Sequence, residues 1–231
     1  MISLVILDFD DTITDNRLLD FKAFETPCKN LGISTPSPQI ISSSRKKGLL
    51  ARDIMQKYLM EIGKSNSLND FLSRRDRFLS DSKSMYYLQL KEHVIQVLAL
   101  LRRKKIKCIL CSARKNKQMV KSFLKYSKIG SYFFTTYFMQ DVGFVLDNLV
   151  RSNRILIKTS LLKQIIKDEH IDPRRILYVG NSSEDSEAAT RLNIQFVYME
   201  NHYLDKELDL DLNRVGNMFD LKQKIQSLVL K

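Results

Sequence analysis

The sequence predicts an α/β protein with a doubly wound parallel sheet and a helical insertion after the first strand. Short apolar runs alternate with stretches whose apolar residues recur at helical spacing, which is typical of a parallel sheet covered by helices. A long stretch with only helical spacing follows the first run. We therefore expect a core formed by residues 1–15 and 90–231, and a helical cap formed by residues 16–89.

The expected strands are continuous apolar runs, because burial on both faces of a parallel sheet removes the polar alternation of a half-exposed strand. The first run is ISLVIL, at residues 2–7, and it ends directly in acidic residues. Similar runs follow at residues 106–111, 132–139, 176–179 and 195–199. Active sites of such sheets lie beyond the carboxyl ends of the strands, so polar residues that follow these runs are the first candidates for chemistry.

The helices expected in the core separate these apolar runs. Their apolar spacing places them at residues 93–105, 115–126, 160–167, 184–192 and 218–230. In the cap, helical spacing is clear in residues 49–62 and 71–79, with Ser-, Asn- and Pro-containing loops between such segments. The last core helix is expected to pack on a face of the sheet.

The composition excludes some nucleotide-binding folds. The seven glycines are too dispersed for a GxGxxG turn or a GxxxxGK loop, both of which need clustered glycines. With 38 Lys and Arg against 26 Asp and Glu, the formal charge of +12 favours anionic partners in general, such as phosphate esters, nucleic acid or acidic membrane surfaces. The hydrophobic fraction of 44% is enough for a sizeable core.

Cysteine usage and hydropathy indicate a soluble, cytoplasmic protein with no membrane partner. We expect it to be a monomer or a homodimer. Three cysteines are too few for a disulfide framework. Cys108 and Cys111 lie three apart in an expected strand, so they point to opposite faces, which favours core packing over zinc binding. The first apolar run lacks the basic start of a signal peptide, and no apolar stretch approaches the roughly 18 residues of a membrane span.

Two aspartates follow the first expected strand with one residue between them. In extended backbone Asp8 and Asp10 would point to the same side. One carboxylate can then attack a substrate while the other transfers a proton, and a metal ion can bridge them. An isolated pair of this kind is usually a solvated turn, but its place directly after a buried strand, with Thr12 next, favours a catalytic role.

Two further positions are candidates for binding phosphate. Ser112 ends the second core strand, and its hydroxyl and the neighbouring main-chain amides, beginning with Ala113, suit a phosphate oxygen. A helix cap is an equally good interpretation of Ser112. Lys158 is expected just ahead of the helix beginning near Ser160, where it could offset nearby carboxylates, and Lys163 is a competing candidate.

Residues 179–189 end a strand and begin a helix. Asn181, Glu184 and Asp185 place oxygen ligands where a hard cation such as Mg²⁺ could bind. Ser182 with Asp185 also fits a helix capping box, as does Asn181 with Glu184. Capping and metal binding can both hold.

Taken together, these clusters resemble the haloacid dehalogenase superfamily of hydrolases. The matching residues are Asp8 and Asp10 in the first motif (DxDxT), Ser112 in the second, Lys158 in the third, and Asn181 with Asp185 in the acidic fourth (GDxxxD). The insertion is placed like the C1 cap of phosphoglycolate phosphatase-like members. The resemblance covers nearly the whole chain.

The resemblance implies a Mg²⁺-dependent phosphatase that acts on a small phosphorylated metabolite. Asp8 would attack phosphorus and form an aspartyl-phosphate, while Asp10 would protonate the leaving alcohol and then activate water. Phosphate would be bound by Ser112, Ala113 and Lys158. The implied ligands of Mg²⁺ are the Asp8 carboxylate, the Asp10 main-chain carbonyl, and Asn181 with Asp185.

Two departures from the family pattern bear on activity. Asn181 stands where an aspartate is usual, so one metal ligand is neutral and the affinity for Mg²⁺ should fall. The third motif lacks the proline that often follows its lysine, and residues 140–153 form a longer stretch than a compact member has.

Alternative functions follow from these departures. A weakly active or non-catalytic phosphate-binding protein fits Asn181 and the basic charge, and a phosphotransferase or mutase fits the same residues. Dehalogenation is disfavoured because Asp10 is present.

The basic run at residues 102–105 closes a helix, where cations complement the helix dipole, which argues against a nucleic-acid partner. Residues 45–47 lie where related caps carry a specificity loop and would suit a second anionic group of a substrate, or form a plain solvated loop.

Overall fold

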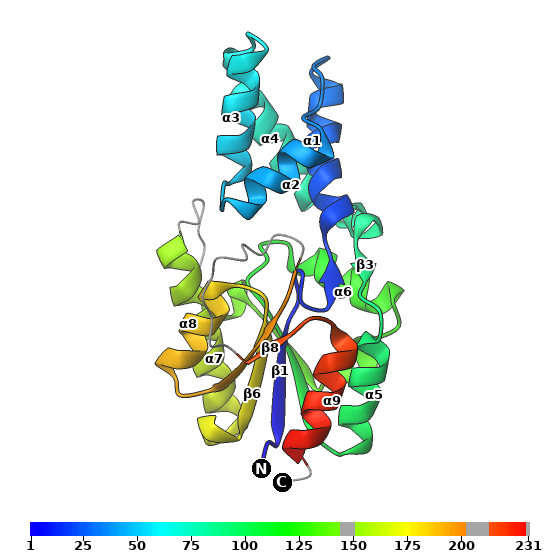
Figure 1. Cartoon of the computed structure of the whole chain (residues 1–231), viewed down its shortest axis with the longest axis vertical. Coiled ribbons are helices and arrows are strands. Elements are labelled where there is room, and N and C mark those ends of the chain that lie inside the picture. The colour runs from blue at the N-terminus through cyan, green and yellow to red at the C-terminus, as the bar shows by residue number, and fades with distance from the viewer. Residues whose placement is uncertain (144–150, 202–212, 230–231) are drawn as a thin grey trace.

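Six strands form one parallel sheet in the computed structural model, which describes residues 1–143, 151–201 and 213–229 (Figure 1). The strand order is β5-β4-β1-β6-β7-β8, and each neighbouring pair is parallel. The strands are β1 (Leu4–Asp8), β4 (Lys107–Ser112), β5 (Thr135–Phe138), β6 (Ile176–Gly180), β7 (Gln195–Met199) and β8 (Arg214–Val215). The predicted fold class is confirmed, with the two-residue strand β8 as an addition.

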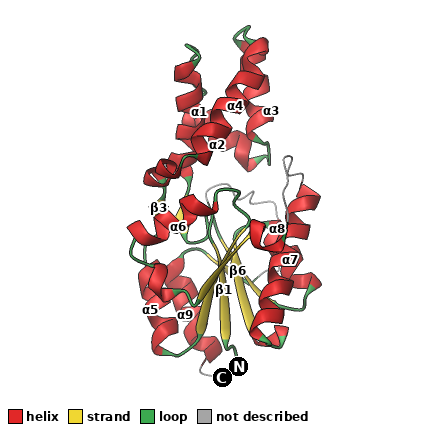
Figure 2. Ribbon diagram, turned by 180° about the vertical axis from the view of Figure 1, so that it is seen from behind, coloured by secondary structure: helices red, strands yellow, loops and turns green. Residues whose placement is uncertain are grey.

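Helices cover both faces of this sheet (Figures 1 and 2). The helices α5 (Val94–Arg103), α6 (Lys117–Tyr126) and α9 (Met218–Val229) contribute to one apolar cluster, which includes Val5 and Leu7 of β1. The helices α7 (Arg151–Glu169) and α8 (Ser183–Arg191) contribute to a second cluster with Leu4 and Ile6. Alternate β1 side chains thus enter opposite layers, which explains the unbroken apolar run.

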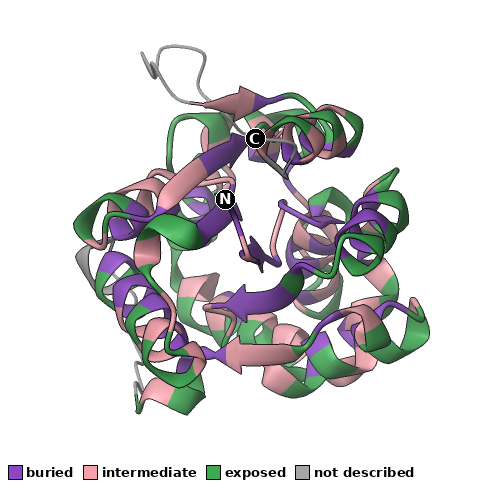
Figure 3. Ribbon diagram, turned by 90° about the horizontal axis from the view of Figure 1, so that it is seen from below, coloured by how far each residue is buried: buried purple, intermediate pink, exposed green. Residues whose placement is uncertain are grey.

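Figure 3 shows the consequence of this layering, with buried strands inside a ring of helices whose outer sides are exposed. Cys108 belongs to the first apolar cluster and Cys111 to the second, so the predicted opposite placement is confirmed. All three cysteines are buried and unpaired. Within the described residues, no helix combines the length and apolar character needed to cross a bilayer.

Two elements of the core begin three or more residues away from their predicted starts. The strand expected over residues 132–139 begins only at Thr135, because residues 130–132 form a 3₁₀ turn. The helix expected from Ser160 begins at Arg151, so Lys158 lies inside a helix and not ahead of it. Lys158 occupies a buried position between apolar neighbours of that helix, and a lysine there interrupts the apolar spacing that marks a helix in the sequence.

The helical insertion lies beyond the carboxyl edge of the sheet (Figures 1 and 2). It contains α1 (Arg17–Asn30), α2 (Pro38–Lys46), α3 (Ala51–Glu61) and α4 (Leu68–Ser80), which share a separate apolar cluster. A short antiparallel ribbon, β2 (Thr14–Asp15) with β3 (Gln89–Leu90), joins it to the core. The predicted limits at residues 15/16 and 89/90 fall at this ribbon, and the division into two domains stays a prediction.

Candidate active site

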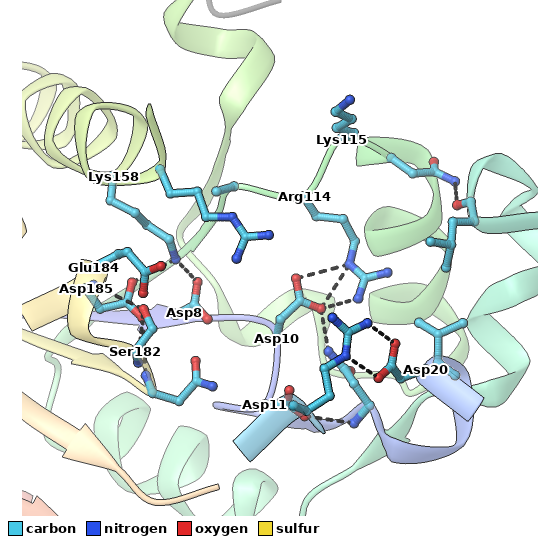
Figure 4. Close-up of a pocket in the computed structure, with 18 of the residues that line it drawn as sticks. Asp8, Asp10, Asp11, Asp20, Arg114, Lys115, Lys158, Ser182, Glu184 and Asp185 are labelled. Atoms are coloured by element: carbon cyan, nitrogen blue, oxygen red, sulfur yellow. Dashed lines mark hydrogen bonds and ion pairs between the residues drawn. The ribbon is translucent and has the colours of Figure 1, made fainter. Parts of the chain in front are cut away.

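A cavity of about 700 Å³ lies between the carboxyl edge of the sheet and the helical insertion (Figure 4). Polar residues from several elements face it, and Figure 4 shows carboxylates and basic groups converging there. The residues predicted for the site that line it are Asp8, Asp10, Ala113, Lys158, Asn181 and Asp185. Strand ends that are far apart in the sequence thus bring these side chains together, as expected for a parallel sheet.

Asp8 and Asp10 both face the cavity, although not for the reason the spacing suggested. Strand β1 ends at Asp8, and the chain then turns, with the amides of Ile13 and Thr14 donating to the carbonyl of Phe9. The period-two rule for extended backbone therefore does not apply to Asp10. The turn places Asp10 beside Arg114, while Asp8 stays at the strand end beside Lys158.

Lys158 joins two carboxylates at the base of the cavity. Its ammonium is ion-paired with Oδ1 of Asp8 and lies 2.8 Å from Oδ1 of Asp185. It also donates a hydrogen bond of 3.3 Å to the hydroxyl of Tyr178. Lys163, the competing candidate, is exposed and does not line the cavity. The geometry therefore singles out Lys158 as the lysine beside the aspartates.

Burial and charge set the protonation of this group. Burial raises the pKa of Asp8 to about 7 against the opposing effect of Lys158. Burial alone would lower the pKa of Lys158, but Asp185 and Asp8 outweigh it and raise that pKa. For Asp185, burial acts to raise the pKa, and the Lys158 ammonium outweighs it, so the pKa is lowered. Lys158 is therefore charged at neutral pH, and Asp185 is its ionised partner.

Asp10 is held by Arg114, a residue the motif analysis missed. The Arg114 Nε lies 2.9 Å from Oδ1 and 3.1 Å from Oδ2 of Asp10, and the Asn16 amide donates to Oδ1 at 2.7 Å. Burial acts to raise the pKa of Asp10, but Arg114 and Asn16 lower it overall. Asp10 is therefore a carboxylate in this arrangement. Its partner follows Ser112 by two residues, so the strand end was the available signal.

The surroundings of Ser112 and Ala113 bear on the two interpretations of Ser112, phosphate binding and helix capping. Ser112 is fully buried at the end of β4, does not line the cavity, and accepts a hydrogen bond of 3.2 Å from the amide of Arg114. It does not cap the next helix, because Asn116 is the N-cap residue of α6. Ala113 does line the cavity, so the main chain after Ser112 is the part that faces it.

Asp185 is the N3 residue of a capping box at the start of α8. Ser182 caps the helix, and Oδ2 of Asp185 accepts from the Ser182 hydroxyl at 2.7 Å and from the amides of Ser182 and Asn181. Oδ1 accepts from the hydroxyl of Tyr178 and faces Lys158. These five donors exceed the four or so lone-pair sites of a carboxylate, so Asp185 is saturated by the protein.

Gly180 permits the close approach of this carboxylate to the end of β6. A Cβ atom at residue 180 would lie 2.6 Å from Cβ and Cγ of Asp185 and 2.7 Å from its Oδ2. Gly180→Ala should therefore lower the free energy of unfolding by about 1–3 kcal/mol, because an overpacked core must shift. Urea unfolding measures this loss. The control is Gly130→Ala, whose Cβ would meet atoms at an ordinary 3.7 Å; equal losses in the two variants would contradict the explanation.

The oxygen atoms on one side of Asp8 are suitable ligands for a hard cation. Oδ2 of Asp8 and Oδ1 of Asn181 each lie 3.3 Å from the hydroxyl oxygen of Thr12. A hydroxyl has one hydrogen to donate, so one of these two acceptors lacks it at any moment. Carboxylate and amide oxygens are the ligands that Mg²⁺ uses.

The side-chain oxygens of Asp8 and Asn181 are few ligands for a metal site. Within the described residues, no group of three or more His, Cys, Asp or Glu side chains is arranged to hold a metal ion. A cation here would depend on Asp8, the Asn181 amide oxygen, main-chain oxygen and oxygens of water or substrate, which is how Mg²⁺ is often bound. Half of the stretch at residues 140–153 that departs from the family pattern, residues 144–150, lies outside the described residues.

The helical insertion adds two arginines to the far side of the cavity. Arg45 of α2 forms two hydrogen bonds with Asp20, of 2.9 and 2.7 Å, and Arg75 of α4 lies 3.6 Å from the same carboxylate. Both guanidinium carbons lie 5.8 Å from the centre of the Phe24 ring. The Arg75 Nε is buried and has no hydrogen-bond partner. Asp76 of α4 lines this side of the cavity as well, so the charges of the two arginines are balanced there by Asp20 and Asp76.

Comparison with known proteins gives one family and many structures of the same fold. A family model described as haloacid dehalogenase-like hydrolase matches residues 5–199. A hydrolase of that superfamily from Geobacter sulfurreducens, subfamily IA variant 1, is 16% identical with a TM-score of 0.72, over 99% of this chain and 96% of that one. A predicted phosphoglycolate phosphatase from Haemophilus somnus is 14% identical with a TM-score of 0.73, over 97% and 98% of the chains. A predicted phosphatase from Clostridium acetobutylicum is 14% identical with a TM-score of 0.69, over 98% and 100%.

Proposed function

Because the chain belongs to the haloacid dehalogenase-like hydrolase family, we propose that it hydrolyses a small phosphate monoester through an aspartyl-phosphate on Asp8. The observation that carries this proposal is the placement of Asp8 at the end of a buried strand, beside Lys158 and in one cavity with Asp10. A carboxylate held there by a charged lysine is placed to attack an anionic phosphorus centre.

The proposed reaction has two steps. An oxygen of Asp8 bonds to phosphorus as the bond to the leaving oxygen breaks, and Asp10 supplies the proton for the leaving alcohol. Water then attacks phosphorus, Asp10 accepts its proton, and phosphate is released with Asp8 restored. Lys158 would neutralise phosphoryl oxygen charge, and the main chain at Ala113 would donate to it.

Arg114 connects substrate binding to the protonation of Asp10 in this scheme. The guanidinium now pairs with Asp10 and keeps its pKa low. An incoming phosphate attracts the same guanidinium, and loss of that partner would raise the pKa of Asp10 toward the range a general acid needs. Arg114 would therefore serve as a positioning residue for Asp10.

We propose Mg²⁺ as the cofactor. Asp8, the Asp10 main-chain carbonyl and Asn181 would hold it, with the saturated Asp185 positioning Asn181 and Lys158 through its hydrogen bonds. Bound Mg²⁺ would neutralise the phosphoryl oxygens.

The substrate class follows from the far side of the cavity. Arg45 and Arg75 place two guanidinium groups there alongside Asp20 and Asp76, and the buried Nε of Arg75 has an open hydrogen-bonding position. We propose that the substrate carries a second anionic group, a carboxylate or another phosphate, that reaches these arginines.

The direct test is an assay of released phosphate at raised Mg²⁺. p-Nitrophenyl phosphate reports the chemical step, and a panel of phosphorylated acids, sugars and nucleotides reports the substrate class. Hydrolysis that needs Mg²⁺ and favours substrates with a second anionic group is expected. Inactivity on the whole panel would overturn the phosphatase proposal, and tight binding without turnover would favour a phosphate-binding protein, for which the sparse metal ligands of the described residues are the supporting observation.

Replacing Asn181 by aspartate should restore a charged metal ligand. In Asn181→Asp the Mg²⁺ concentration for half-maximal activity should fall about 10-fold or more, because carboxylate count tunes the affinity for hard cations. A Mg²⁺ titration of hydrolysis measures this. The control is Asn69→Asp on the exposed surface of α4, which adds the same charge away from the cavity. An unchanged requirement in Asn181→Asp would show that residue 181 is not a metal ligand.

Two further proposals concern the whole chain. We propose a cytoplasmic location, which the three unpaired, buried cysteines support. We also propose residues 16–89 as a cap domain that closes the cavity, which the cap residues lining it support.

A further inference from the structure

The positive charge of the protein is concentrated in one segment. Residues 93–140 contain eleven Lys and Arg and no Asp or Glu. The other 183 residues carry 27 Lys and Arg against 26 Asp and Glu, so nearly all of the net charge of +12 arises within this segment. Of these eleven cations only Arg114 and Lys115 line the catalytic cavity, so the cavity does not account for most of the excess. Charge of one sign repels itself, and a bound anion would relieve that repulsion.

The fold gathers most of these cations on the exposed side of two neighbouring helices. The segment forms α5, β4, α6 and β5, and β5 is the edge strand of the sheet. Seven of its cations are exposed and form no ion pair with any described residue. We name them the basic face: Arg102, Arg103, Lys104, Lys105, Lys121, Lys125 and Lys128.

The basic face is continuous from α6 to the end of α5. Lys121, Lys125 and Lys128 line one hollow of about 530 Å³ together with the chain at residues 130–131 and Thr136. The Arg102 guanidinium lies 5.1 Å from the centre of the Tyr132 ring, which links the end of α5 to the turn beside that hollow. Both helices pack on the same face of the sheet (Figure 1).

One exposed aromatic side chain lies on the same helix as the three lysines of the hollow. Tyr126 of α6 follows Lys125 and is 63% exposed, with its ring centre 5.6 Å from that of Tyr86. Phe134 is also 63% exposed, but its ring lies 4.3 Å from the ammonium of Lys107, which pairs with Glu169 at the end of α7 on the other face of the sheet. The only exposed large aliphatic side chain in the segment, all of which is described, is Ile95. Insertion into a bilayer needs aliphatic and aromatic side chains together, whereas stacking on nucleobases needs aromatic rings beside cations.

Although residues 102–105 by themselves argued against a nucleic-acid partner, we propose that the whole basic face binds single-stranded nucleic acid, with backbone phosphates on the lysines of α6 and the cations that end α5, and a base stacked on Tyr126. Such ligands are commonly bound by cations along the backbone together with aromatic rings under the bases. Helix α6 is about 15 Å long, enough for more than one phosphate contact along its lysines. This surface is separate from the catalytic cavity, and the proposal does not depend on the phosphatase function.

The test is fluorescence anisotropy of the full chain with labelled oligouridylate and oligothymidylate of about 20 nucleotides, titrated with salt. The variant Lys121→Gln/Lys125→Gln/Lys128→Gln should lose on the order of 10-fold in affinity, and the slope of log affinity against log salt should fall by about 2. The control Lys29→Gln/Lys57→Gln/Lys64→Gln removes the same charge from exposed positions in the helical insertion and should stay within about 2-fold. Comparison of the two oligonucleotides distinguishes RNA from DNA.

A second variant tests the aromatic contribution. Tyr126→Ser should weaken binding about 5-fold or more with an unchanged salt slope, because stacking releases no counterions. Absence of oligonucleotide binding at low salt, or equal losses in the two lysine triples, would overturn the proposal. Binding to phosphatidylserine vesicles that the α6 triple abolishes, without oligonucleotide binding, would overturn it in favour of a membrane surface.

Discussion

Asp8→Asn should abolish phosphate release, with kcat reduced at least about 10³-fold, because an amide cannot attack phosphorus. The substitution keeps the shape of the side chain at the end of β1. Lys158 retains Asp185 as its charged partner, and the pKa of Asp8 is already raised to about 7, so loss of its charge costs little stability. Steady-state hydrolysis of p-nitrophenyl phosphate and urea unfolding of the same sample measure the two effects separately.

The matched control for this variant is Asp70→Asn, at an exposed position in the first turn of α4. It should leave hydrolysis within about 2-fold of the parent, because a surface charge far from the cavity has little effect on chemistry. Phosphate release that survives Asp8→Asn would remove Asp8 as the nucleophile and with it the proposed mechanism. A folded but inactive Asp8→Asn variant is the supporting result.

Lys158→Met should lower the free energy of unfolding by about 3–5 kcal/mol and remove activity. The substitution preserves most of the side-chain volume but leaves Asp8 and Asp185 facing a buried position without their shared cation. An uncompensated carboxylate in that position is costly because little solvent reaches it. Urea denaturation at neutral pH, with hydrolysis measured in parallel, checks both parts.

Two further variants make the Lys158 prediction specific. Lys163→Met changes an exposed lysine of the same helix and should alter stability by less than about 0.5 kcal/mol. The double variant Lys158→Met/Asp185→Asn removes the facing charge and should recover part of the stability lost in the single variant, since the two sites are in contact. A loss below about 1 kcal/mol in Lys158→Met would show that the buried ion pairs are not what holds these strand ends together.

The sequence alone determined the fold class, because the signals for it are local. An unbroken apolar run such as residues 2–7 indicates a strand buried on both faces, and its alternation with helical spacing indicates a parallel sheet. The same apolar run placed Asp8 at a strand end, and the spacing of Ser182 and Asp185 at a helix start indicated their capping box. Each of these features depends on residues within one element or its immediate neighbours.

The tertiary structure decided which polar groups meet. Lys158 broke the apolar spacing of α7 in the sequence, so the helix was predicted to start too late, yet in the fold that same position directs its ammonium to Asp8 and Asp185. Arg75 had no local pattern that distinguished it among 38 basic residues, and for Arg114 the only local signal was the strand end at Ser112. Their contacts join residues separated by 104 positions for Arg114 and Asp10, and they exist only after sheet and insertion have assembled.

The charge distribution, too, is visible partly in the sequence and partly only in the assembled fold. The absence of acidic residues from 93 to 140 is visible in the sequence, but a count along the chain does not tell which cations share a surface. The packing of α5 and α6 on one face of the sheet places them together, with Tyr126 exposed on α6. Periodicity reports the environment of a residue within its own helix or strand, whereas a binding surface is made by contacts between elements, which only the assembled chain specifies.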